Sequence, residues 1–137
     1  MTRITGEIAT DVISSVVGAG GTAAVAVSIA VVDEAGGLVS FQRMTGAPRF
    51  SADFAIAKAR TAATFGTETS RLEELYADRP VFAHSFVAQA GYFLGRGGVP
   101  ILVAGEVVGA IGVSGADAHG EEDIARGAAE RAGALAG

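Results

Sequence analysis

The chain has 137 residues, and its 15 acidic against 10 basic side chains give it a net charge of −5. This balance disfavours a nucleic-acid partner, because binding to phosphates needs a basic stripe. The absence of cysteine excludes disulfides, thiolate metal sites and cysteine nucleophiles. The length fits a single domain over residues 1–137. No apolar stretch approaches the ~18 residues of a membrane span, so we expect a cytoplasmic protein without a membrane partner.

The first third of the chain predicts a helix followed by a β-hairpin. Apolar residues recur at helical spacing over residues 4–17, and the glycine-rich segment 18–21 ends the helix. Residues 24–32 alternate valine or isoleucine with small residues, which is typical of a strand covered on both faces. A turn at 33–37 then leads into a returning strand over 38–44.

Two or three helices are expected next. Ser51 is a candidate N-cap for an alanine-rich helix that runs to about Phe65. Ser70 and Glu73 have the spacing of a capping box and predict the start of a second helix. Residues 81–90 are ambiguous and are compatible with one more short helix.

The last third predicts strands and a closing helix. Residues 92–94 are compatible with a short strand, and 101–104 and 107–113 predict a hairpin with a type II′ turn. A helix follows over about 121–135. The expected order is therefore α-β-β-α-α-(α)-β-β-β-α. The fold class is α+β, with about five largely antiparallel strands flanked by helices.

Several common functional motifs are excluded by their context. The glycines at 18–21 follow a helix and those at 95–98 precede a strand, whereas a dinucleotide site needs a strand before and a helix after. His84 and His119 are far apart and have no metal-ligand spacing, so no metal site is predicted. Ser114 lies in Gly-Val-Ser-Gly, which does not match a nucleophile elbow.

Two features remain as candidates for chemistry. Arg43 ends a strand beside the loop at Gly46 and Ala47, where it could hold a carboxylate or simply reach solvent. The second feature is a helical stripe at i, i+4, i+7 and i+11, formed by Phe54, Lys58, Thr61 and Phe65. This stripe suits a pocket wall with one positive anchor, or a helix edge from which Lys58 extends into water.

Three blocks of the sequence resemble the GlcG/HbpS-like family, also described as DUF336 or PduO C-terminal-like. Residues 29–44 resemble its VVDxxGxLVxFxRM signature, and 57–65 resemble its AxxKAxTAxxF helix. Residues 97–115 resemble its GGxPIxxxGxxxGAIGVSG segment. With the two features above, the blocks give the candidate ligand-binding set Arg43, Met44, Gly46, Ala47, Phe54, Lys58, Thr61, Phe65, Gly97, Gly98, Pro100 and Ser114.

The resemblance implies an α/β domain with an antiparallel sheet, homodimers that assemble into octamers, and heme or corrinoid binding in some members. Two positions depart from the family pattern. Thr45 replaces an aspartate in the loop usually read RMDGA, and the first helix lacks the histidine that some members use as an axial ligand. Histidine-ligated heme would therefore need His84 or His119.

Three functions are compatible with these observations. The first is an oligomeric carrier or sensor of heme, another tetrapyrrole or iron, in which Lys58 and Arg43 meet the propionates. The second is a cofactor-independent isomerase or tautomerase, in which Arg43 or Lys58 holds an anionic metabolite and Lys58 moves a proton. The third is a structural subunit without a ligand.

We also expect self-association, because half of the residues are hydrophobic and a chain this small must expose many positions. The first helix has apolar residues on more than one side, and the strand at 25–31 has small residues on its alternate face. Such surfaces suit close packing of another element or another chain, and a symmetric dimer would cover them.

Overall fold

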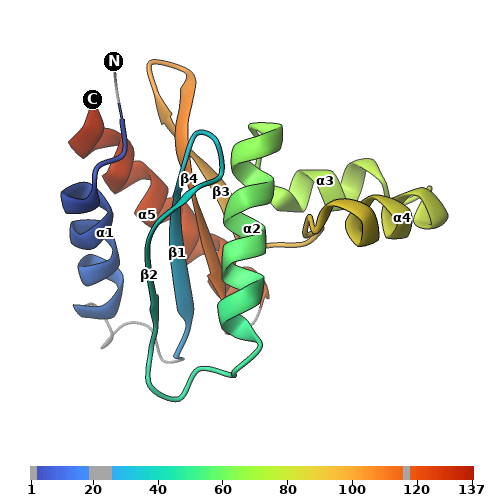
Figure 1. Ribbon diagram of the computed structural model, residues 1–137, viewed down its shortest axis with the longest axis horizontal. Coiled ribbons are helices and arrows are strands. Elements are labelled where there is room, and N and C mark those ends of the chain that lie inside the picture. Colours follow the sequence, from blue (N-terminus) through green and yellow to red (C-terminus); the bar gives the residue numbers. More distant parts are fainter. Residues whose placement is uncertain (1–2, 19–25, 116–117) are drawn as a thin grey trace.

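A sheet of four antiparallel strands forms the centre of the computed structural model, which describes residues 3–18, 26–115 and 118–137. The strands lie in the order β2-β1-β4-β3 (Figure 1). They are β1 (Ser28–Asp33), β2 (Leu38–Arg43), β3 (Gly98–Val103) and β4 (Glu106–Ser114). The helices are α1 (Gly6–Gly18), α2 (Ser51–Phe65), α3 (Thr69–Leu75), α4 (Pro80–Ala90) and α5 (Ala118–Ala136).

Helices cover both faces of the sheet. Helices α1 and α5 pack on one face and α2 packs on the other (Figure 1). Side chains alternate along β1. Ile29 and Val31 therefore point into the core beneath α1 and α5, and Ala30 and Val32 point into the core beneath α2. This strand is therefore buried on both sides, as its sequence predicted.

Small residues let α2 lie very close to the sheet. Ala55 and Ala59 face Gly112 of β4, and a Cβ atom at Gly112 would collide with the backbone of both residues. Gly98 of β3 meets the carbonyl of Lys58 in the same way. Helix α2 is thereby fixed against the ends of β3 and β4, where the candidate site lies.

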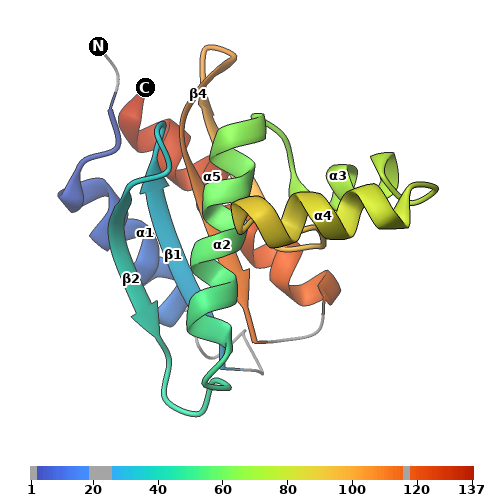
Figure 2. The same cartoon turned by 45° about the vertical axis from the view of Figure 1, so that its right-hand side comes forward.

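Residues 75–94, here called the arm, extend away from the sheet beyond α2 (Figures 1 and 2). No residue of α4, all of which the structure describes, is buried. Aromatic contacts attach the arm to α2: the Phe65 ring lies 5.3 Å from that of Phe86 and 5.0 Å from that of Tyr92. The arm is therefore held in place by rings rather than by a core of its own.

The predicted α+β class and antiparallel sheet are confirmed, but the described residues contain four strands rather than about five. The strand expected at 92–94 does not form. Instead, the Phe93 amide donates a hydrogen bond to the Thr61 hydroxyl at 2.8 Å, so it is not available to a sheet. The helix considered at 81–90 is present as α4. The predicted start of the first strand at 24–25 lies outside the described residues.

Three local predictions were wrong for identifiable reasons. Ser51 is inside α2 rather than its N-cap, because its hydroxyl bonds to Ser28 and to the Pro48 carbonyl. The capping box at Ser70 is absent, since α3 already begins at Thr69. The β3–β4 turn has positive φ at both central residues, 51° at Ala104 and 80° at Gly105, which makes it type I′ instead of II′.

Candidate functional site

An open pocket of about 400 Å³, here called the Lys58 pocket, lies where α2, the end of β4 and the start of α5 meet. Its aromatic and aliphatic walls come from α2, the residue before it and the segment that precedes β3. Its polar groups come from α2, α3, β4, α5 and the same segment before β3. The lining residues are Phe50, Phe54, Lys58, Glu73, Phe93, Leu94, Gly95, Arg96, Ser114 and Glu121.

A buried ion pair forms the inner end of the pocket. The Lys58 Nζ atom lies 3.0 Å from Glu121 Oε2, and it also donates to the Val113 carbonyl oxygen at 3.0 Å. The other Glu121 oxygen accepts a hydrogen bond from the Gly115 amide at 2.9 Å. Only 3% of the Lys58 side chain is exposed. The positive charge of Lys58 is therefore already balanced by a carboxylate.

The fold leaves space for this lysine by omitting a side chain beside it. Gly97 has φ +118°, which favours glycine, and a Cβ atom there would lie 2.5 Å from the Val113 oxygen and 3.1 Å from Lys58 Nζ. The Gly97 carbonyl accepts a hydrogen bond from the Val113 amide. Gly97 thus holds the end of β4 next to Lys58.

Burial lowers the pKa of the Lys58 amine below its ordinary value of 10.5, because the charged form loses hydration. The hydrogen bond and the negative charge of Glu121 act in the opposite direction and reduce this effect. The site therefore combines a lysine of depressed pKa with a carboxylate that favours its protonated form.

Three phenylalanine rings line one side of the pocket. The Phe50 and Phe54 ring centroids are 5.2 Å apart, and those of Phe54 and Phe93 are 5.0 Å apart. Lys58 Nζ lies 5.0 Å from the Phe93 centroid, within range of a cation–π contact. The Thr61 hydroxyl fixes Phe93 through its amide. Phe50 and Phe54 are 56% and 41% exposed, so their rings are accessible to a ligand.

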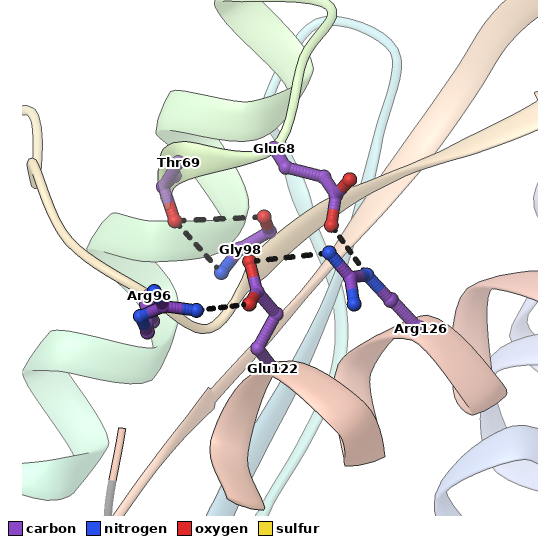
Figure 3. A network of polar contacts seen from close by, with 6 residues as sticks. All are labelled: Glu68, Thr69, Arg96, Gly98, Glu122 and Arg126. Carbon is purple, nitrogen blue, oxygen red and sulfur yellow. Dashed lines mark hydrogen bonds and ion pairs between the residues drawn. The ribbon is translucent and has the colours of Figure 1, made fainter. Parts of the chain in front are cut away.

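Beside the pocket, two arginines hold a second buried carboxylate (Figure 3). Arg96 Nη1 lies 2.7 Å from Glu122 Oε2, and Arg126 Nη2 lies 3.7 Å from Glu122 Oε1. Burial acts to raise the pKa of Glu122, but Ser70 and the charges of Arg126 and Arg96 outweigh it and keep this pKa below 4.5. The Arg96 side chain remains 34% exposed, so it is the accessible cation at the pocket.

Some of the predicted site residues meet here. Phe54, Lys58 and Ser114 line the pocket. Thr61 supports Phe93, and Gly97 and Gly98 allow α2 to approach β3. Phe65, the fourth residue of the predicted stripe, contacts the arm instead.

The Arg43 loop and Pro100 lie elsewhere. Arg43 donates to the Ala47 carbonyl at 3.0 Å, Gly46 turns the loop with φ +93°, and Met44 packs on the core beneath α1 and α5. None of these described residues lines the Lys58 pocket. Arg43 ends the outer strand β2, two strands away from β4, at roughly 10 Å across the sheet. Pro100 lines a separate groove with Glu68 and Arg126.

Three important residues were missed by the sequence analysis. Glu121 was considered only as the start of the closing helix, Phe93 was assigned to a possible strand, and Arg96 lay among the glycines at 95–98 without a role of its own. The signal that could have found one of them is the presence of a single lysine in the chain, at a position facing the sheet, which needs a carboxylate partner.

The described residues contain no group of three or more His, Asp or Glu placed to hold a metal ion. His84 lies on α4, and the side chain of His119 is outside the described part of the structure. Among the described helices, none is both long and apolar enough to cross a membrane.

Comparison with known proteins identifies the family to which this chain belongs. A family model described as "Haem degrading protein HbpS-like" matches residues 4–130. The chain belongs to the HbpS-like family. Protein GlcG of Escherichia coli strain K12 is 39% identical over 88 residues, which span 64% of this HbpS-like chain and 63% of that protein. The matched region is thus less than two thirds of GlcG.

Solved structures share the fold over almost the whole chain. A double mutant of HbpS from Streptomyces reticuli superimposes with a TM-score of 0.83 at 33% identity, covering 100% of this chain and 89% of the other. The Klebsiella pneumoniae protein ORFY, a DUF336 member, has a TM-score of 0.88 at 28% identity, with coverages of 98% and 94%. A PduOC–heme complex has a TM-score of 0.83 at 23% identity, covers 94% of each chain and supports the fold alone.

Proposed function

We propose that the Lys58 pocket binds a planar tetrapyrrole carboxylate, with heme as the first ligand to test. The observation that carries this proposal is the row of Phe50, Phe54 and Phe93 rings in one pocket with the partly exposed side chain of Arg96. The description of the family as haem-degrading supports the same class of ligand.

The pocket fits the periphery of such a ligand. Aromatic rings offer flat apolar surface for a macrocycle, in the offset or tilted contacts that such rings prefer. Arg96 can give a propionate a charge-assisted hydrogen bond without leaving Glu122. The volume of about 400 Å³ lies in the lower part of the range for small-molecule sites, so part of a macrocycle would extend beyond the pocket.

The pocket does not fit heme iron equally well. Among the described residues that line it, there is no histidine, methionine or tyrosine, and Glu121 is engaged by Lys58. We therefore assign no axial ligand. When bound, heme would supply the redox chemistry of its iron, while Phe54, Phe93 and Arg96 hold the macrocycle and one propionate.

The pocket fits the macrocycle but offers no axial ligand to the iron, so heme and an iron-free porphyrin can be compared directly. Hemin and metal-free protoporphyrin IX should bind with similar affinity, seen as a Soret shift and as a change in porphyrin fluorescence. Arg96→Gln should weaken both about tenfold or more, since a hydrogen bond to a charged group contributes about 1.5–3 kcal/mol. Arg131→Gln, which alters an exposed arginine paired with Asp11, is the matched control. Absence of any spectral change at micromolar protein would overturn the proposal.

A second function, proton transfer in an isomerase or tautomerase, is favoured by the depressed pKa of Lys58 beside an open pocket. Lys58 is the only lysine, so isotope-labelled lysine gives one side-chain NMR resonance whose titration reports this pKa. We expect a value below 10.5. Glu121→Gln should lower it further, because it removes the negative charge that opposes the effect of burial. A titration at or above 10.5 would remove Lys58 as a base.

A further inference from the structure

The side-chain nitrogen of Lys58 has one bonding position that its neighbours leave unused. A lysine ammonium group has three N–H donors. Lys58 Nζ donates to Glu121 Oε2 and to the Val113 carbonyl oxygen, each at 3.0 Å, and to no other oxygen of the described residues. In the neutral amine, two N–H groups can keep both of these partners, and the lone pair takes the third position. The fold therefore holds this amine in an arrangement that suits a nucleophile.

The amine also lies beside a space that a ligand can enter. Only 3% of the Lys58 side chain is exposed, yet it lines the open pocket of about 400 Å³. The Phe93 centroid lies 5.0 Å from Nζ, and the Phe54 ring continues the same apolar wall. An ion pair that only stabilises the fold needs no access from solvent, whereas a reacting group does. The position of Lys58 at the wall of an open pocket favours the second role.

Glu121 allows the amine to lose a proton without releasing it to solvent. A proton can pass from Lys58 Nζ to Glu121 Oε2 within their existing hydrogen bond of 3.0 Å. Burial favours this uncharged pair, because both charged groups lose hydration, and it lowers the pKa of Lys58. A lysine that loses its hydration in an apolar pocket is one of the forms in which proteins use an amine to attack carbonyl compounds.

We propose that Lys58 forms an imine with an aldehyde or ketone bound in the pocket, and that Glu121 carries the protons. The substrate class is an aromatic carbonyl compound with a carboxylate, because rings such as Phe54 and Phe93 form the wall and Arg96 is the accessible cation. This activity goes beyond tetrapyrrole binding and does not depend on it.

The atoms and protons of this step balance. Proton transfer from Lys58 Nζ leaves a neutral amine and a protonated Glu121. Nζ bonds to the carbonyl carbon as the π bond of the carbonyl group breaks. The oxygen takes the proton of Glu121, and the carboxylate removes one from the nitrogen, which gives a carbinolamine. Glu121 returns this proton to the hydroxyl, the C–O bond breaks, and the nitrogen lone pair completes the C=N bond. The products are one water and a protonated imine paired with the Glu121 carboxylate.

Reductive trapping with 4-formylbenzoate tests this proposal. Sodium cyanoborohydride converts the imine to a stable secondary amine, and mass spectrometry of the chain and its peptides locates the added carboxybenzyl group. Lys58 is the only lysine, so the N-terminal amine serves as the internal reference. At neutral pH, Lys58 of the folded chain should be labelled at least about tenfold faster than the N-terminal amine, because the pocket orients the aldehyde and Glu121 transfers the protons. The rate should saturate with aldehyde concentration.

The wild-type chain unfolded in urea is the control. There the amine of Lys58 has a higher pKa than the α-amine and is more fully protonated, so the preference should reverse toward the N-terminus. Label confined to the N-terminal amine of the folded chain would overturn the proposal. Equal labelling of Lys58 in the folded and unfolded chain would do the same. A chain that shifts the Soret band of hemin but is not trapped at Lys58 would keep the proposed function and lose this activity.

Two variants test the groups around the amine. Glu121→Gln keeps a hydrogen-bonding side chain that cannot exchange protons, so trapping at Lys58 should fall about 100-fold. Glu130→Gln, on the same helix but at a separate groove, is the matched control and should be trapped like the wild type. Arg96→Gln should reduce the preference for 4-formylbenzoate over benzaldehyde about tenfold, because it removes the charged partner of the carboxylate. An unchanged rate in folded Glu121→Gln would contradict the proton transfer, and an unchanged preference in Arg96→Gln would contradict the substrate class.

Discussion

Helices α2 and α4 are close in the chain and have opposite environments. Helix α2 contains three charged residues, Asp53, Lys58 and Arg60, and yet seven of its positions are buried. Helix α4 contains no charged residue, and none of its positions is buried. The more polar helix is therefore the one that belongs to the core.

The difference comes from the surfaces that face each helix. Opposite α2, Gly98 and Gly112 leave space on the sheet for its backbone. Opposite α4, the described residues of the chain offer the aromatic rings that contact Phe86, and Phe93 and Leu94 at the border of a groove along α4. Apolar composition thus indicates that a helix will be covered, while the shape of its neighbours decides whether its own chain does so.

The largest effect is expected from removing the buried charge of α2, which is that of Lys58. Lys58→Met should lower the free energy of unfolding by about 3–5 kcal/mol, because it leaves the Glu121 carboxylate buried and unpaired. Urea unfolding followed by circular dichroism measures the change. A loss below about 1 kcal/mol would mean that water reaches Glu121 and that the pair is not part of the core.

The double variant Lys58→Met/Glu121→Leu is the control, since it removes both charges and should recover most of the loss. Stability against pH gives a second control. The folded pKa of Lys58 lies below the unfolded one, so the unfolded chain binds more protons in the alkaline range. Wild-type stability should therefore gain from Lys58 as the pH rises toward 10.5, and Lys58→Met should lose this gain.

Local patterns predicted the elements better than the contacts between them. Alternation in β1 and alanine spacing in α2 are properties of adjacent residues, and both elements form close to the expected positions. The boundary of α2 at Phe65 follows from Gly66, whose φ of +66° ends the helix. The strand expected at 92–94 failed because a distant hydroxyl, that of Thr61, competes for the Phe93 amide.

The candidate site depends on contacts between side chains of different elements, which the periodicity of a single element does not predict. The stripe on α2 brought Phe54 and Lys58 to one pocket, because helical spacing alone places them on the same side. Lys58 and Glu121 meet only because α2 and α5 approach the end of β4 from opposite faces. Arg43 was grouped with Lys58 without knowledge of the strand order, which places it on the edge strand β2, separated from Ser114 of β4 by Ser28 of β1.

A smaller effect is expected where α2 rests on the sheet. Gly112→Ala places a methyl group against the Ala55 carbonyl and should cost about 1–3 kcal/mol as the helix shifts. Gly127→Ala is the matched control on α5, where no atom lies near the added Cβ. It should stabilise the chain by up to about 1 kcal/mol through helix propensity. Equal effects of the two substitutions on thermal unfolding would show that α2 is not closely packed.

The smallest effect is expected on α4. Val81→Thr should change the unfolding free energy by less than about 0.5 kcal/mol in dilute protein, because Val81 is 80% exposed. The same substitution at Val32, which is fully buried beneath α2, should cost about 1–3 kcal/mol, since it buries a hydroxyl without a partner. Denaturant unfolding at about 1 µM protein compares the two.

Raising the protein concentration then shows whether a second copy of the chain covers the exposed apolar residues of the arm. If a second copy covers it, the wild-type midpoint rises with concentration by mass action, and Val81→Thr reduces that rise while the Val32→Thr deficit stays constant. A wild-type midpoint that does not depend on concentration, together with a large loss for Val81→Thr in dilute protein, would contradict the comparison. Val81 would then be covered by its own chain, and α4 would belong to the core as α2 does.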